Sequence, residues 1–281
     1  MRVALTVLAA AFCSACFGTP TPLAPGVSGS VGAPHHGVLT VAAELPKAGD
    51  GFVRYRPNGP NNWGNPRLVH LIETAAKHVH DVSPGPPLVV GDLSGHDGGK
   101  IERHESHRTG RDVDLPWFVT TAAGVAVQVP GFINIGADGL AKVDGADGYL
   151  RLDIPREWLL VKTLLTSPDA EVQWMFCSTD VEGLLIDYAR ARGEPPELVW
   201  HAETVLIQPE DSLPHDDHIH LRIACTPEEA VLGCEGGGPR WDWLPPLPAS
   251  AMNDDEAIYR NAHDDPPPPQ SPEEPDGVPG G

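Results

Sequence analysis

The chain has 281 residues, of which 41% are hydrophobic and 21% are charged. This length and composition are typical of a soluble globular protein with one large domain or two small ones. The formal net charge of −20 argues against a nucleic-acid-binding function, because surfaces that bind nucleic acid are basic.

The first 18 residues, MRVALTVLAAAFCSACFG, have the pattern of a secretory signal. One Arg precedes an apolar run from Val3 to Phe12, which is too short to span a bilayer as a mature helix. Small residues stand directly before Cys16, as at a bacterial lipoprotein cleavage site, although Cys13 stands where Leu is usual. We expect export, with either a lipid anchor on Cys16 or ordinary cleavage and release.

Composition divides the rest of the chain into three parts. Residues 19–50 are rich in Pro, Gly, Ala and Ser and are expected to form a linker. Residues 245–281 combine Pro runs with acidic side chains and are expected to be a disordered tail. The folded domain is therefore expected at 51–244.

Hydrophobic periodicity predicts four helices in this domain before the last motif. In NPRLVHLIETAAKHVHDV, Asn65 is the expected N-cap and Pro66 the first helical residue, which leaves the three histidines of this helix on the surface. Further helices are expected at 156–166, at 180–192 with Gly193 as its C-terminal stop, and from Pro195 or Pro196 to about Thr204.

Three apolar stretches predict strands between these helices: PPLVVGDLS, RDVDLPWF and EVQWMFCS. Strands and helices are mixed without strict βαβ alternation. We therefore expect an α+β fold with a central, largely antiparallel sheet and flanking helices.

A histidine-rich strand is predicted at HDDHIHLRIA. Apolar and polar residues alternate, which indicates a half-buried strand with His218 and His220 on one face, roughly 7 Å apart. His215 lies just upstream and can fold over that face. Imidazoles gathered in this way suit a metal centre with catalytic groups, whereas the alternative is a solvated edge strand.

A second polar stretch, SGHDGGKIERHESHRTGRDVDLPW, covers residues 94–117. In it six residues separate His107 from Asp114, and His104 and Asp112 lie close by. The H-E-x-x-H motif of zincins is absent from it, because position 108 is Arg. The order is thus H-x6-D, followed far downstream by H-x-H.

Together these motifs resemble the zinc peptidases grouped around lysostaphin, the D-Ala-D-Ala carboxypeptidases and the hedgehog N-terminal domain. The stronger resemblance is to the penicillin-insensitive murein endopeptidases of Gram-negative bacteria. The stretches that carry it are GDLS, HESHRTGRDVD and HDDHIHLRIAC, supported by NNWGNPRLVHLI and a late cysteine pair. The resemblance covers about residues 60–240 and implies a hedgehog/D-Ala-D-Ala peptidase-like fold.

The resemblance implies that His107, Asp114 and His220 bind Zn²⁺. Such a set leaves one place of a tetrahedral ion open for water, as a catalytic site requires. It further implies that His218 is the catalytic base, and that His215 stabilises the oxyanion or protonates the leaving amine.

Several roles stay open. Asp112 shares a strand face with Asp114, so the choice of Asp114 as ligand rests on the family spacing. Asp112 or Asp217 can orient a ligand imidazole. His104 either contacts substrate or a second metal, or lies in a surface turn.

Two other polar residues also have alternative roles. Asp92 either forms a hydrogen bond in the site or finishes its strand. Arg222 either binds a substrate carboxylate or makes a structural salt bridge.

The cysteines fit an exported protein. Cys225 and Cys234 are close in sequence, and in an oxidising compartment we expect them to form a disulfide. Cys177 ends an apolar run and is expected to be a buried free thiol.

The sequence therefore predicts a zinc-dependent murein endopeptidase that hydrolyses D-alanyl–diaminopimelate cross-links in the periplasm or at the outer membrane. The alternatives are a zinc D,D-carboxypeptidase, another exported amidohydrolase, or a non-enzymatic wall-binding module with a structural zinc. The expected partner is cross-linked peptidoglycan, with no nucleic acid.

Overall fold

The computed structural model describes residues 29–128, 131–142, 148–210 and 212–247. The expected signal segment, Cys16 and residues 248–281 of the expected tail lie outside these ranges. None of the helices within the described ranges is both long enough and apolar enough to cross a membrane.

Helix α1 (Pro66–Val82) forms where the sequence predicts it. The Asn65 side chain accepts a hydrogen bond from the Arg67 backbone N–H at 3.0 Å and so caps the first turn. One face of the helix is buried in the core, and each buried Leu or Ile contributes about 1.5–3 kcal/mol relative to exposure. The buried residues of this face are Leu68, Val69, Leu71, Ile72, Ala75, Ala76 and Val79.

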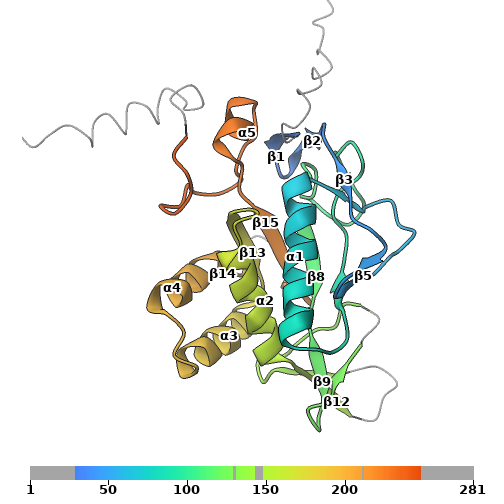
Figure 1. The fold of residues 1–281 in the computed structure, drawn as a ribbon, viewed down its shortest axis with the longest axis vertical. Coiled ribbons are helices and arrows are strands. Elements are labelled where there is room, and N and C mark those ends of the chain that lie inside the picture. Colours follow the sequence, from blue (N-terminus) through green and yellow to red (C-terminus); the bar gives the residue numbers. More distant parts are fainter. Residues whose placement is uncertain (1–28, 129–130, 143–147, 211, 248–281) are drawn as a thin grey trace, which may run out of the picture.

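The other long helices are also confirmed, with their ends shifted by a residue or two. They are α2 (Ile154–Thr166), α3 (Thr179–Ala191) and α4 (Pro196–Val205). Gly193 follows α3 with φ +70°, a conformation that glycine adopts without steric cost. Figure 1 shows α2, α3 and α4 grouped together, with α1 beside α2.

The central sheet has four strands in the order β14-β13-β15-β8. These are β14 (Leu206–Ile207), β13 (Val172–Phe176), β15 (His218–Ile223) and β8 (Asp112–Pro116). β15 is antiparallel to both of its neighbours, whereas β14 is parallel to β13. The predicted α+β class with a largely antiparallel central sheet is confirmed.

One expectation about β15 is wrong. We expected a half-buried strand, but every residue from Ile219 to Ile223 is buried and only His218 is partly exposed. The reason is its position between β13 and β8, where other parts of the protein cover both faces. The polar side chains of this strand therefore need hydrogen-bond or ion-pair partners within the protein.

The remaining strands form small sheets. One joins β4 (Ala48–Gly49), β5 (Phe52–Arg54) and β7 (Leu88–Val90), and backbone hydrogen bonds of Gly91 and Asp92 tie it to Asp114 on β8. The strands of an antiparallel sheet are β10 (Ala126–Val127), β9 (Val119–Thr121), β12 (Tyr149–Leu152) and β11 (Leu140–Lys142).

The expected linker at 19–50 is wrong for its described part. Residues 30–49 form β1 (Ser30–Ala33), β2 (His36–Leu39), β3 (Ala43–Glu44) and β4, and β3 pairs with β6 (Trp63–Gly64). These strands have four residues or fewer, too short to show a hydrophobic period in sequence. Contacts such as the Ser30 hydroxyl donating to the Thr109 carbonyl at 2.7 Å attach them to the folded body.

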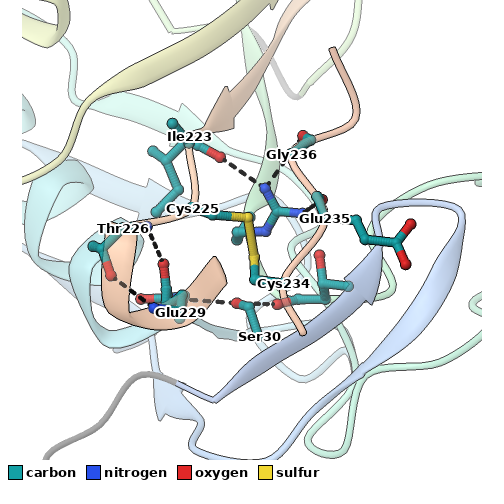
Figure 2. The surroundings of a disulfide bond; sticks show 12 residues. Ser30, Ile223, Cys225, Thr226, Glu229, Cys234, Glu235 and Gly236 are labelled. Carbon is teal, nitrogen blue, oxygen red and sulfur yellow. Dashed lines mark hydrogen bonds between the residues drawn. A yellow bond between two sulfur atoms is a disulfide. The ribbon is translucent and has the colours of Figure 1, made fainter. Parts of the chain in front are cut away.

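The expected disulfide between Cys225 and Cys234 is present, and Cys177 is a buried free thiol. Figure 2 shows the disulfide beside the short helix α5 (Pro227–Val231), where Thr226 and Glu229 form a reciprocal capping box. The carbonyls of Glu235 and Gly236, directly after Cys234, accept hydrogen bonds from the buried Arg111 guanidinium.

Candidate metal centre

The pairing of β8 with β15 brings the two polar motifs together. In this antiparallel register His220 lies opposite Asp114, and Arg222 lies opposite Asp112. Residues directly opposite each other on neighbouring strands have side chains within contact distance. The H-x6-D and H-x-H motifs therefore form one cluster.

His107 reaches this cluster from a loop. Its backbone has φ 64°, a left-handed conformation that is rare for residues other than glycine and costs of order 1 kcal/mol or more. Its ring Nδ1 donates to the Leu93 carbonyl at 2.7 Å, so in the neutral ring Nε2 carries the lone pair. Nε2 points to Asp114 Oδ1 at 3.3 Å, and the side chain is fully buried.

Asp114 Oδ1 is the atom on which the imidazoles converge. It lies 3.3 Å from His107 Nε2, 3.3 Å from His218 Nε2 and 3.2 Å from His220 Nδ1. Burial opposes ionisation of Asp114, but His107 and His218 outweigh it and hold its pKa well below the ordinary value.

The polar atoms at the centre suit a metal ion. Asp114 Oδ1 and His107 Nε2 are buried and have no hydrogen-bond partner among the described residues. Such atoms are costly unless a proton, a water or a cation satisfies them. Imidazole nitrogens together with a carboxylate oxygen are the donor set of catalytic zinc sites.

Two separate groups of three residues have the spacing of metal ligands. One consists of His104, His107 and Asp114, and the other of His215, His218 and His220; within each group the ligand atoms lie within 4.8 Å of one another. All five histidines assigned to the site from sequence are thus brought together around Asp114.

Asp112 contacts the ring nitrogen of His220 that is not directed at Asp114. Its Oδ1 accepts from His220 Nε2 at 2.8 Å and from Arg222 Nε at 2.6 Å. Burial opposes ionisation of Asp112, but Arg222 and His220 keep its pKa far below the ordinary value. This contact leaves His220 Nδ1 directed at Asp114. It also commits Arg222, which is 8% exposed, to a structural salt bridge rather than to substrate.

His218 lies between two carboxylates, with Nε2 toward Asp114 and Nδ1 bonded to Asp217. Although burial lowers its pKa, the two carboxylates raise it to about 10. His215 is placed differently. Burial and the neighbouring His218 and His220 lower its pKa to about 4, and its Nδ1 is buried without a hydrogen-bond partner among the described residues.

His104 and Asp92 form an outer part of the cluster. His104 Nε2 lies 3.4 Å from Asp92 Oδ2, and its Nδ1 lies 3.7 Å from Asp114 Oδ2. Asp92 Oδ2 also accepts from Asn61 Nδ2 at 3.2 Å. Of the two alternatives for Asp92, the side-chain contact in the site is the one observed.

Some residues around the cluster had no sequence signal. The Phe132 ring meets His218 edge to face, with 5.3 Å between ring centroids, and Phe176 lies 5.5 Å from the His220 ring. Neither belongs to a motif. Period-two alternation predicts that Phe176 lies on the same face of β13 as Trp174. Phe132 follows a loop, where no periodic pattern predicts its position.

An α+β fold with a buried Asp and converging imidazoles defines a candidate metal-binding hydrolase. A model of the family described as penicillin-insensitive murein endopeptidase matches residues 30–129, which include His104, His107 and Asp114 but not the later histidines.

Named relatives extend the match over most of the chain. A penicillin-insensitive murein endopeptidase of Klebsiella pneumoniae is 27% identical over 216 residues, which is 76% of this chain and 72% of the relative. One from Escherichia coli O17:K52:H18 is 26% identical over 213 residues, which is 75% of this chain and 71% of the relative. Over about three quarters of its length the chain is thus similar to penicillin-insensitive murein endopeptidases, which is the resemblance that its motifs led us to expect.

Proposed function

We propose that this protein is a zinc-dependent murein endopeptidase that hydrolyses D-alanyl–diaminopimelate cross-links in peptidoglycan. The observation that carries the proposal is the convergence of three imidazole nitrogens on Asp114 Oδ1 at 3.2–3.3 Å. The names of the relatives support murein as the substrate.

His107 Nε2, His220 Nδ1 and an Asp114 carboxylate oxygen are the proposed zinc ligands. The two ligand histidines are each fixed through the other ring nitrogen, His107 by the Leu93 carbonyl and His220 by Asp112. Such second contacts set the tautomer and direct the free nitrogen to the ion. When bound, zinc supplies Lewis acidity and lowers the pKa of water enough for attack near neutral pH.

His218 is the proposed base that takes a proton from the attacking water. Asp217 accepts from Nδ1 of His218 and so leaves Nε2 facing the centre. A divalent cation beside Asp114 opposes the effect of that carboxylate and favours the neutral form of His218 that a base requires.

His215 is proposed to stabilise the oxyanion. The low pKa of His215 favours a neutral ring, which can donate a hydrogen bond to a developing negative charge. Of the two roles expected for it, protonation of the leaving amine fits less well, because a ring that is neutral at pH 7 has only a weakly acidic N–H to give.

The setting of the enzyme is part of the proposal. We propose a periplasmic location, with export by the N-terminal segment and either lipidation of Cys16 or release. The peptidase body is proposed to span about residues 29–247 and to share its architecture with the hedgehog and D-Ala-D-Ala peptidase group.

Digestion of purified sacculi with the zinc-loaded chain tests the activity. Mass spectrometry should show cross-linked dimers converted to monomers. Release of terminal D-Ala with intact dimers would instead support a D,D-carboxypeptidase, and no product at all would support a binding module.

Two variants test the assigned roles. His218→Ala and His215→Ala should each lose most turnover while binding zinc with near wild-type stoichiometry. Full activity of both variants would contradict the assignment.

A further inference from the structure

The loop after β5 carries Arg56 to the rim of the His/Asp cluster. The preceding residue, Tyr55, meets Phe132 edge to face with 5.3 Å between ring centroids. Phe132 in turn contacts His218 in the same geometry at 5.3 Å. This chain of aromatic contacts places the loop beside the proposed catalytic base.

A second set of contacts leads from Arg56 to the same cluster. Arg56 Nη1 lies 3.5 Å from Asp92 Oδ2, which lies 3.4 Å from His104 Nε2. His104 lies 3.7 Å from the far oxygen of Asp114. Two independent routes thus connect the loop to the centre.

The Arg56 guanidinium is available to a ligand. Its side chain is 49% exposed, and among the described residues its ion pair is the one with Asp92 at 3.5 Å. A guanidinium has five N–H donors, so most of them stay free. Two other arginines near the cluster are not available: Arg111 and Arg222 are buried and bound to the protein's own acceptors.

We propose that Arg56 binds a free carboxylate of the substrate next to the bond that is cut. This deepens the proposed endopeptidase function and rests on it. In an amide linked to one end of diaminopimelate, the carbon that carries the amide nitrogen also carries a free carboxylate. Arginine matches a carboxylate with two parallel hydrogen bonds, which gives orientation as well as attraction.

The charge of the chain makes such a local cation necessary. The net charge of −20 repels an acidic ligand at long range, and the centre itself contains Asp92, Asp112, Asp114 and Asp217. The exposed Arg56 guanidinium at the rim supplies a positive charge that offsets this repulsion for a carboxylate next to the scissile amide.

The experiment compares two cross-linked muropeptide dimers, one with this carboxylate free and one with it amidated. We expect the zinc-loaded wild-type chain to prefer the free acid at least about tenfold in kcat/KM, mainly through KM. Arg56→Gln should lose this preference, and Arg56→Lys should keep part of it. Arg103→Gln is the matched control, because it removes the same charge from an exposed position one residue before His104 and should keep the preference.

Equal kcat/KM values of the wild type for the two dimers would overturn the proposal. So would an Arg56→Gln variant that slows both dimers equally, because Arg56 would then act on the structure and not on the carboxylate.

Binding separates this proposal from the endopeptidase function. Calorimetry with the zinc-loaded His218→Ala chain should show the acid dimer binding at least about tenfold more tightly than the amide, and Arg56→Gln in that background should remove the difference. If the wild type cuts neither dimer but this preference is present, the endopeptidase function fails and the carboxylate site stands. Equal affinities exclude the carboxylate site whatever the turnover.

Discussion

Asp112 and Asp114 lie on one face of β8, yet their surroundings give them different roles. Asp114 Oδ1 faces three imidazole nitrogens and has no hydrogen-bond donor among the described residues, whereas Asp112 Oδ1 accepts from His220 and Arg222. Period-two alternation predicts the shared face but not the neighbours across the strand pair. The family spacing was needed to choose Asp114 as the proposed ligand.

Asp112→Asn should weaken zinc binding about 10- to 100-fold, because the amide no longer accepts a charge-assisted hydrogen bond from His220 and leaves Arg222 unpaired. Competition with a chromophoric chelator measures the affinity. Asp217→Asn is the control: its contact is with His218, so zinc affinity should change little while turnover falls. Equal zinc affinities of Asp112→Asn and wild type would contradict the assignment of Asp112.

Glu157 gives a pH-dependent stability that is independent of the metal centre. It is fully buried in α2, and its Oε2 accepts from the Phe118 backbone N–H at 3.0 Å. Burial raises its pKa to about 8 from the ordinary value of 4.5. Between these two pH values the folded chain keeps a proton that the unfolded chain has lost, so stability falls as pH rises through this window.

Glu157→Gln should remove this part of the pH dependence, on the order of 4 kcal/mol between pH 4 and pH 9. Urea unfolding of variant and wild type across that range measures the difference in unfolding free energy, which should shift in favour of the variant as pH rises. Glu197→Gln, at an exposed position of α4, should give no such trend. If the unfolding free energies of Glu157→Gln and wild type change in parallel with pH, the Glu157 carboxyl is not buried as a neutral group.

The individual elements were the most predictable part of the fold. Helices α1 to α4 and strands β7, β8, β13 and β15 form where periodicity, caps and Pro or Gly boundaries indicate. The short strands of residues 30–49 were missed, because two to four residues contain no measurable period. They are held by backbone pairing and by contacts with distant loops, which composition does not encode.

The Cys225–Cys234 disulfide supports the centre through the segment that follows it. The carbonyls of Glu235 and Gly236 hold Arg111, which directly precedes Asp112 on β8. Replacing both cysteines by Ser should lower the free energy of unfolding by up to about 3 kcal/mol and should also weaken zinc binding. Denaturant unfolding and metal competition measure the two effects.

Reductant provides the matched control for this pair of substitutions. It should change the unfolding and zinc affinity of the wild type and leave the double Ser variant unaffected. A wild type that keeps its full zinc affinity after reduction would separate the disulfide from the metal centre.

For the whole molecule, the proposed zinc site predicts that stability depends on metal binding. The proposed zinc ligands from β8, β15 and the loop at His107 are brought together only in the folded chain, so zinc should bind the folded state in preference to the unfolded one. At a zinc concentration about 1,000 times Kd this contributes roughly 4 kcal/mol, or on the order of 10 °C in Tm for a domain of this size.

Excess chelator should therefore lower Tm by about this amount and stop turnover, and added zinc should restore both. Differential scanning calorimetry and the sacculus assay check the two readouts. Magnesium instead of zinc should restore neither, because a site of two imidazoles and one carboxylate does not suit its preference for oxygen ligands. A Tm that does not respond to chelator would rule out a metal bound by these residues.

By itself the sequence determined the helices and main strands, the disulfide pair, the two metal-type motifs and, through their order, the resemblance to murein endopeptidases. These features depend on local periodicity or on residue spacing along the chain. The tertiary structure alone showed that Asp112 bonds to His220, that Arg222 pairs with Asp112 and that Arg56 pairs with Asp92 at the rim. Those assignments depend on strand register and loop packing, which join residues far apart in sequence through contacts that no local pattern specifies.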